Sequence, residues 1–145
     1  MEKQLNELLA DIIVESHKML NCHWYNKGEN FYAMHLKTEQ LYHDFINMSD
    51  EIAELMLMMG YMPVANLKEC LQIAHIKELR SHYIEETLVN EGMMIDFKYL
   101  LDAMKNIKSL ADETENDIVV IKLDEYIYYL SKQLWILNQS KNIVI

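Results

Sequence analysis

Helix-breaking residues are rare in this chain and separate long segments of helical periodicity. The 145 residues include only three glycines and one proline. Gly28, Gly60 and Pro63 lie where the helical spacing of apolar residues stops. Because glycine and proline are the strongest local breakers of regular structure, the segments between them can form long helices. The sequence therefore predicts an all-α protein with few helices, each of them long.

Four long helices are predicted from apolar residues that recur at a spacing of about 3.6. The segment NLKE (Asn66–Glu69) resembles a capping box and predicts a short extra helix in the connection between the second and third. Asn30 is the candidate N-cap of the second helix. The predicted ranges are residues 3–26, residues 31–59, residues 80–109 and, after the acidic segment ADETEND, a helix that ends near Asn138.

Two short turns and one long crossover between the second and third helices describe a ferritin-like four-helix bundle. Helix propensity alone does not distinguish this connectivity from a cytokine-like bundle. The length suits one domain, residues 1–145, with a core large enough to need no metal or disulfide. Cys22 and Cys70 are not spaced as a CxxC pair, so we expect them to be reduced and packed.

Charge and hydropathy restrict the partners of this protein. The formal net charge of −10 disfavours contact with the phosphates of nucleic acids and favours attraction of cations. Lys3 and Lys141 do not make lysine-rich tails, so DNA binding is not expected. No segment approaches the ~20 apolar residues of a membrane span, and MEKQLNELLADIIVE lacks the pattern of a secretory signal. We therefore expect a cytoplasmic protein without membrane contact.

Side chains suited to metal binding form one stripe along the second predicted helix. At 100° per residue they fall within an arc of about 100°. Chance placement of polar residues on a solvated face explains the stripe alone more simply than a site does. Moreover, the midpoint of the pair His35/Glu39 lies about 22 Å along the helix from the midpoint of the pair Asp50/Glu54, so one ion cannot contact both pairs. The stripe consists of His35, Glu39, His43, Ile46, Asp50 and Glu54.

A second copy of this helix would bring the separated ligand pairs together. If two copies pack antiparallel about a two-fold axis near residues 44 and 45, His35 and Glu39 of one copy face Asp50 and Glu54 of the other. The same symmetry generates the site twice. His43 lies close to this axis, and we interpret it as a histidine packed at a subunit contact in preference to a residue that tunes or extends the metal site.

His23 completes the predicted ligand set. His23 and His35 are equidistant from Glu29, the centre of the turn NKGEN, and helices joined by a short turn pack antiparallel, so both histidines should lie at one height. Two imidazoles with three carboxylates suit ferrous iron, and zinc would accept the same groups. The predicted set is His23, His35 and Glu39 from one subunit with Asp50 and Glu54 from its partner.

The segments HWYNKGENFYAMH and SDEIAELMLMMGYMP, with Glu39 between them, resemble the Dps family of mini-ferritins. These ferritin-like proteins oxidise and store iron in hollow shells of twelve subunits. The resemblance implies that the five predicted ligands bind iron at a ferroxidase site shared by a two-fold dimer. It also implies that hydrogen peroxide, or more slowly oxygen, oxidises the iron, which protects against oxidative stress.

The resemblance assigns roles to three further residues. Trp24 matches a tryptophan close to the family's iron site, where it could quench radicals, although a packing role is an equal alternative. Asp112 and Asp117 match acids that line three-fold pores for iron entry. The dipole of the last predicted helix favours acids in this neighbourhood whatever the function. Both readings of these acids therefore stay open.

Several positions depart from the family pattern. Asn26 stands where an aliphatic residue is usual, Met34 where leucine is usual, Leu55 where arginine is common, and Glu39 where many members have aspartate. The sequence also has no histidine three residues after a glutamate, so the ExxH motif of intrachain di-iron bundles is missing. This absence favours a site shared between subunits.

Two other functions remain open from the sequence. One is a non-catalytic shell that sequesters divalent metal ions, with zinc or iron at the same ligands and no turnover. The other is a protein that compacts DNA, which the negative charge disfavours.

Overall fold

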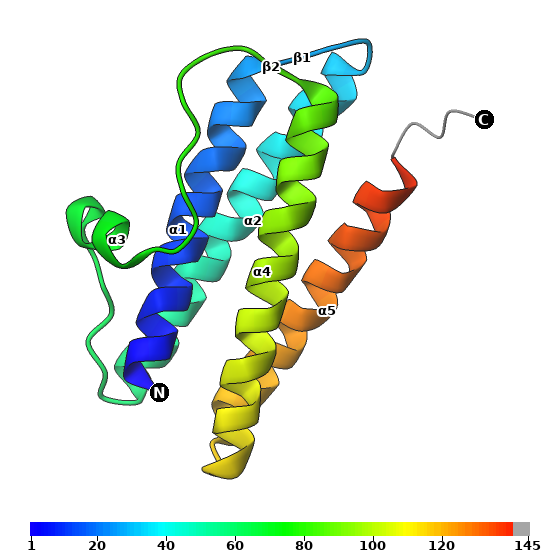
Figure 1. Cartoon of the computed structure of the whole chain (residues 1–145). Coiled ribbons are helices and arrows are strands. Elements are labelled where there is room, and N and C mark those ends of the chain that lie inside the picture. The colour runs from blue at the N-terminus through cyan, green and yellow to red at the C-terminus, as the bar shows by residue number, and fades with distance from the viewer. Residues whose placement is uncertain (141–145) are drawn as a thin grey trace. The chain divides into compact units, whose positions relative to one another are not determined.

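The structure is a computed structural model that describes residues 1–140 (Figure 1). Its contacts divide the chain into two compact units, Met1–Glu86 and Thr87–Ile145. Five helices and two very short strands make up its regular structure within these described residues. The prediction of a single domain over residues 1–145 stays a prediction, and each unit is described below by itself.

Two long helices dominate the first unit. They are α1 (Glu2–Tyr25) and α2 (Phe31–Met58), and they pack side by side, joined by a short turn. The first and last residues of both helices agree with the predicted ranges to within one residue. Asn30 takes the predicted N-cap position of α2, but its side chain makes no capping hydrogen bond. The largest fully buried side chains of the pair include Leu5, Leu8, Leu9, Ile12 and Met19 of α1, and Leu41, Phe45, Ile52 and Met56 of α2.

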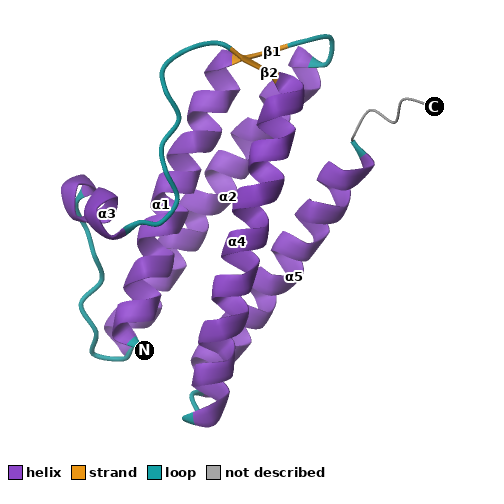
Figure 2. Ribbon diagram, in the orientation of Figure 1, coloured by secondary structure: helices purple, strands orange, loops and turns teal. Residues whose placement is uncertain are grey.

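The long crossover after α2 contains a short helix and ends in a short strand. Helix α3 (Leu67–Ile73) begins after Asn66, whose side chain accepts a hydrogen bond from the backbone N–H of Glu69 at 3.0 Å, so the predicted extra helix is confirmed. Strand β1 (Asn26–Lys27) of the first turn pairs in parallel with β2 (Ile84–Glu85) at the end of the crossover (Figure 2). The crossover thus returns to the turn between α1 and α2.

Polar side chains of α1 hold the crossover through its backbone. The side chains of Asn6 and Asn21 hydrogen-bond to backbone groups of the crossover, and Asp11 does so in a buried position. The Asp11 carboxylate accepts hydrogen bonds from the backbone N–H groups of His75 and Ile76 at 2.6 and 2.8 Å. Desolvation by burial raises the pKa of Asp11, although these bonds oppose the rise.

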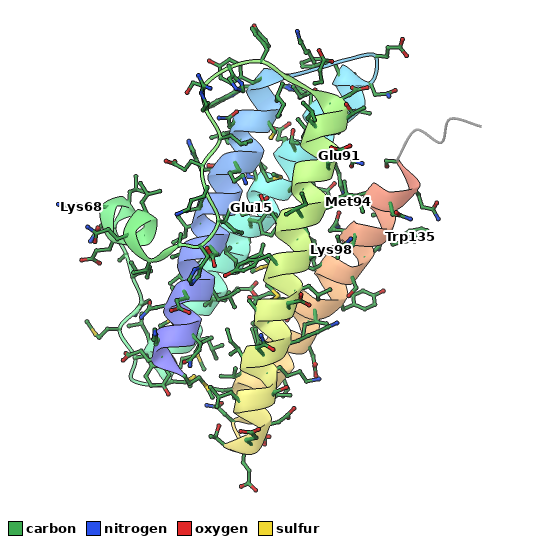
Figure 3. All side chains as sticks on the ribbon, viewed as in Figure 1. Glu15, Lys68, Glu91, Met94, Lys98 and Trp135 are labelled. Carbon is green, nitrogen blue, oxygen red and sulfur yellow. The ribbon has the colours of Figure 1, made fainter. Side chains whose placement is uncertain are left out.

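Helices α4 (Glu86–Glu113) and α5 (Asp117–Gln139) make up nearly all of the described part of the second unit. Their connection contains Glu115 at a φ of 55°, and the side chain of Asn116 caps α5. The ammonium of Lys108 on α4 lies 2.6 Å from a carboxylate oxygen of Asp124 on α5. Trp135 extends from α5 to the surface and is 59% exposed (Figure 3).

The bounds of α4 correct the sequence prediction. The helix begins at Glu86 rather than residue 80, because the residues just before it are extended and pair with β1. It ends at Glu113 rather than residue 109, since residues 110–113 include no glycine or proline and the backbone turns only at Glu115, with a φ of 55°. Asp112 and Glu113 therefore lie in the last turn of α4. They precede the final helix, as predicted from the sequence, but as part of α4 rather than of the connection between the two helices.

Two further predictions concern cysteines and membranes. Within residues 1–140, Cys22 and Cys70 form no disulfide and both are buried, in agreement with the prediction. Across the described residues, no helix is long and apolar enough to span a bilayer.

Candidate metal centre

His23 and His35 lie against each other where α1 ends and α2 begins. Their ring centroids are 3.7 Å apart and their planes differ by 15°. Phe31 stacks on His35 at a centroid distance of 5.1 Å. The short turn thus brings the two histidines to one height, and this predicted proximity is confirmed. Their role as metal ligands stays a prediction.

Reciprocal hydrogen bonds fix the orientation of the two imidazoles. Nδ1 of His23 lies 2.7 Å from the backbone carbonyl oxygen of His35, and Nδ1 of His35 lies 2.7 Å from that of His23. A carbonyl oxygen can only accept, so both Nδ1 atoms carry hydrogen and donate. In a neutral imidazole, Nε2 then keeps its lone pair and is available to a metal ion. This is the usual arrangement around a metal-binding histidine.

The stacking also restricts how the pair can bind metal. The lone pair of Nε2 lies in the plane of its ring, and an ion binds about 2.0–2.1 Å along it. Because the rings are nearly parallel with centroids 3.7 Å apart, an ion in the plane of one ring lies out of the plane of the other. In this arrangement the two imidazoles suit two separate ions rather than one.

The predicted carboxylate ligands are not brought to the histidine pair within one chain. Glu39, Asp50 and Glu54 are all exposed on α2. Along the helix, the midpoint of Asp50 and Glu54 lies about 22 Å from the midpoint of His35 and Glu39. Among residues 1–140, no group of three or more His, Cys, Asp or Glu side chains is placed to hold a metal ion. One chain therefore presents the ligands in separate groups.

Apolar side chains are exposed on the same side of α2. Tyr32 is 75% exposed, Leu36 47% and Leu57 58%, and Ile46 of the stripe is also exposed. At 100° per residue these four fall within the arc of the ligand stripe. A helix face that mixes ligands with exposed apolar residues is typical of a surface that another protein covers.

Trp24 and His43 are both accessible in the single chain. Trp24 follows His23 directly and is 58% exposed, so it does not pack in the core of its own chain. His43 is exposed on α2, and its ring contacts the edge of the Tyr42 ring at a centroid distance of 5.2 Å. The radical-quenching role of Trp24 and the contact role of His43 stay predictions.

The predicted pore acids, Asp112 and Asp117, occupy opposite helix ends. Both are exposed, Asp117 in the first turn of α5 and Asp112 in the last turn of α4. The helix dipole stabilises an acid in the first turn of a helix, as at Asp117, but destabilises one in the last turn, as at Asp112. A hydrogen bond from Lys108 to Asp124 raises the pKa of Lys108, and Asp112 adds to the rise. The dipole thus explains Asp117 but not Asp112.

Residues that hold the α1–α2 turn were not singled out from the sequence. The carboxylate of Glu86 accepts hydrogen bonds from the backbone N–H of Asn30 at 3.0 and 3.3 Å and from its side-chain amide at 3.1 Å. Gly28, at a φ of 153°, lies so close that an added Cβ would meet the Glu86 carboxyl carbon at 2.4 Å. Gly28 was visible as a turn signal. Nothing local connects that turn to Glu86, 56 residues beyond Asn30.

Comparison with known proteins places this architecture in a family. The ferritin-like domain family matches residues 2–142. DNA protection during starvation protein 2 of Bacillus anthracis is 35% identical over 138 residues, which cover 95% of this chain and 94% of the relative.

Solved structures agree with this placement. The crystal structure of Dps from Staphylococcus aureus has a TM-score of 0.93 at 30% identity and covers 98% of this chain and 95% of that one. Dps from Vibrio cholerae O1, described as one of the ferritin-like diiron-carboxylate proteins, has a TM-score of 0.91 at 30% identity, covering 95% and 86%. The predicted ferritin-like fold is thereby confirmed, and the chain belongs to the Dps family of mini-ferritins.

Proposed function

We propose that this protein is a ferroxidase that oxidises ferrous iron at sites shared between two-fold related copies and stores the ferric product in a hollow shell of twelve copies. The physiological result is protection against oxidative stress. The observation that carries the proposal is the stacked pair of His23 and His35, in which reciprocal Nδ1–H bonds leave both Nε2 atoms available to metal.

Each site combines ligands from two chains. The ring planes favour one ion per imidazole, so the site takes two ferrous ions. The description of the Vibrio cholerae relative as a diiron-carboxylate protein agrees with this number. Carboxylates stabilise the ferric product, since hard anionic oxygens bind ferric iron better than ferrous. The proposed set is His23, His35 and Glu39 from one copy with Asp50 and Glu54 from the other.

Two ferrous ions match the electron demand of one hydrogen peroxide. Each ion gives one electron, the O–O bond breaks, and both oxygens leave as water or hydroxide. The ferric ions then hydrolyse to oxide-hydroxide and release protons to solvent. Because both electrons are delivered at one site, peroxide is consumed without release of a hydroxyl radical. Oxygen is the slower oxidant.

The partner that completes the site is a second copy of this chain. The ligand stripe is accompanied by exposed apolar side chains, which a two-fold contact would bury. Further contacts between such dimers would close the shell. With a net charge of −10, the shell has no general attraction for DNA, and the proposed cellular location is the cytoplasm.

Two residue assignments extend the proposal. Trp24, which is exposed beside His23, is proposed to donate an electron to a stray oxidant before it escapes. Asp112 and Asp117 are proposed to line the entry pore for ferrous iron, where a concentration of negative charge attracts cations. The dipole of α4 does not favour Asp112 near its C-terminus, and the charge of Lys108 one turn earlier offsets part of this cost.

Peroxide-driven oxidation tests the proposed activity. Ferrous iron is added anaerobically, peroxide follows, and ferric absorbance is recorded. His35→Ala and Asp50→Ala should each slow the reaction strongly, whereas His17→Ala, at an exposed histidine on α1, should not. Binding of iron or zinc with no rapid ferric signal would instead favour the non-catalytic sequestering shell.

Subunit mixing tests whether the site is shared. Neither His35→Ala nor Asp50→Ala chains alone can form an intact site, because every site contains one altered half. If equal amounts are unfolded and assembled together, half of the dimers are mixed and each holds one intact site, so about a quarter of wild-type activity should return. A site within one chain predicts no recovery.

A further inference from the structure

On the basis of the proposed function, we infer that Glu86 is a positioning residue for the histidine pair. Its carboxylate holds the turn Asn26–Asn30 in the conformation that stacks His23 on His35. Glu86 does not contact the rings and is no ligand. It acts through Asn30, which occupies the N-cap position of α2 five residues before His35.

The contacts of Glu86 are concentrated on the start of α2. The backbone N–H of Asn30 donates to both carboxylate oxygens, and the Asn30 side-chain amide donates to one of them. Hydrogen bonds to an ionised acceptor are stronger than neutral ones. Gly28 is what permits this approach, since any Cβ there would overlap the Glu86 side chain. The Asn30 side chain is therefore used to hold Glu86 rather than to cap its own helix.

The other end of the turn is anchored to the same crossover. Asn26 pairs with Ile84 in the β1–β2 ladder, two residues before Glu86. The buried side-chain amide of Asn26 also donates to the Cys22 carbonyl at 2.8 Å, and the His23 carbonyl lies 3.5 Å away. Thus β2 holds the end of α1 while Glu86 holds the start of α2.

The histidine pair is sensitive to the placement of these two helix ends. Each Nδ1–H must reach a carbonyl on the opposite helix, and both distances are 2.7 Å. Movement of the two helix ends apart by about 1 Å along these bonds would lengthen both beyond the usual range of 2.7–3.2 Å. The imidazoles would then sample other rotamers and tautomers, and their Nε2 atoms would no longer be oriented for metal before an ion binds.

Cobalt binding measures this preorganisation without any oxidation. Wild type, Glu86→Ala, Glu86→Gln and Glu85→Ala are titrated with Co²⁺ anaerobically and without peroxide. Loss of a group that orients a ligand typically weakens metal binding 10- to 100-fold, and since Glu86 acts one step further away we expect about tenfold for Glu86→Ala. Glu86→Gln should stay within about twofold, because its amide oxygen still accepts from the Asn30 N–H.

Glu85→Ala is the matched control. It removes an acid from the adjacent position together with the ion pair to Lys27, whose atoms are 3.5 Å apart and whose side chains are both 58% exposed. It leaves the contacts of Asn30 untouched, so Co²⁺ affinity should not change. Equal affinities for Glu86→Ala and Glu85→Ala would overturn the inference.

A metal-free readout separates positioning from general stability. In crystals of the apo variants, Glu86→Ala should lose at least one of the two Nδ1-to-carbonyl contacts, while Glu86→Gln keeps both. If Glu86→Ala does not assemble, Asn30→Asp carries the test, because it sets a second carboxylate against Glu86. That variant should bind Co²⁺ more weakly than Asn30→Ala, and equal binding would count against the inference.

Failure of the proposed function would look different. If wild type binds Co²⁺ but does not oxidise iron, the ferroxidase proposal fails while the variant series still decides the role of Glu86. If oxidation is rapid and Glu86→Ala retains both the stacked rings and wild-type Co²⁺ affinity, the ferroxidase proposal stands and the role of Glu86 is refuted.

Discussion

Substitution of Gly28 by alanine should destabilise the protein more than the same change at either other glycine. Gly28 has a φ of 153°, where side chains are strained, and its added Cβ would lie 2.4 Å from the Glu86 carboxyl carbon. The backbone strain costs about 1–3 kcal/mol. Displacement of Glu86 forfeits its bonds to Asn30, each worth about 0.5–1.5 kcal/mol and less in this exposed position. The expected loss of unfolding free energy is about 2–4 kcal/mol.

The other two glycines provide controls that separate strain from overlap. Gly60 has a φ of 79° but nothing within 4 Å of an added Cβ, so Gly60→Ala should show backbone strain alone, about 1–2 kcal/mol. Gly92 lies within α4 with open space around it, so Gly92→Ala should stabilise the protein by about 0.5–1 kcal/mol.

Urea unfolding at equal subunit concentration measures this order. Far-UV circular dichroism follows the helices, and fluorescence follows Trp24 in the first unit and Trp135 in the second. The reasoning requires Gly92→Ala to be the most stable variant and Gly28→Ala the least. If Gly28→Ala costs no more than Gly60→Ala, Glu86 can move aside freely, and the turn does not depend on the close approach seen here.

Four other outcomes are expected from the structure and the sequence. Asp11→Asn keeps an oxygen for the backbone N–H groups of the crossover and removes a buried charge, so it should be at least as stable as wild type in urea at pH 7, whereas Asp11→Ala should lose about 2–4 kcal/mol. Because burial raises the folded-state pKa of Asp11 above its unfolded value, wild type should regain stability relative to Asp11→Asn as pH falls through that raised pKa. Asn26→Leu removes a buried side-chain oxygen that accepts no hydrogen bond among the described residues, but it also removes the side-chain amide that donates to the Cys22 carbonyl at 2.8 Å. Since that carbonyl still accepts from the backbone N–H of residue 26, the two effects should nearly cancel, and the unfolding free energy measured in urea should change by less than about 1 kcal/mol. Finally, a mobility-shift titration at low salt should show no retarded DNA, given the charge of −10.

Features set by local spacing were predictable from the sequence. The bounds of α1 and α2 follow from apolar periodicity and from the breakers around Gly28, and Asn66 opens α3 because an N-cap is a local signal. The proximity of His23 and His35 follows from the same regularity, since a short turn fixes which residues lie at equal height.

Features set by distant contacts were not predictable. The start of α4 was placed too early because the extended conformation of Ile84 and Glu85 depends on pairing with the first turn. Periodicity also predicts on which helix face and at which height a residue lies, but not the orientation of its ring. The stacking of the two imidazoles, which favours two separate ions, could therefore not be predicted. Glu86 was missed for the same reason, because its partner Asn30 is remote in sequence.

The two copies contribute different features to the proposed site, which explains why contacts between residues remote in sequence matter. A partner copy can add Asp50 and Glu54 to the proposed site, but it does not supply the Nδ1–H bonds that orient the two imidazoles, because both bonds join residues of one chain. The orientation of His23 and His35 must therefore be set within one chain, and their mutual Nδ1–H bonds do so only while the two helix ends stay in register. Since α2 begins right after the turn, the residues that fix the turn also fix the direction of both Nε2 lone pairs. A half-site on the surface of one chain can thus be ready for metal before the second half arrives.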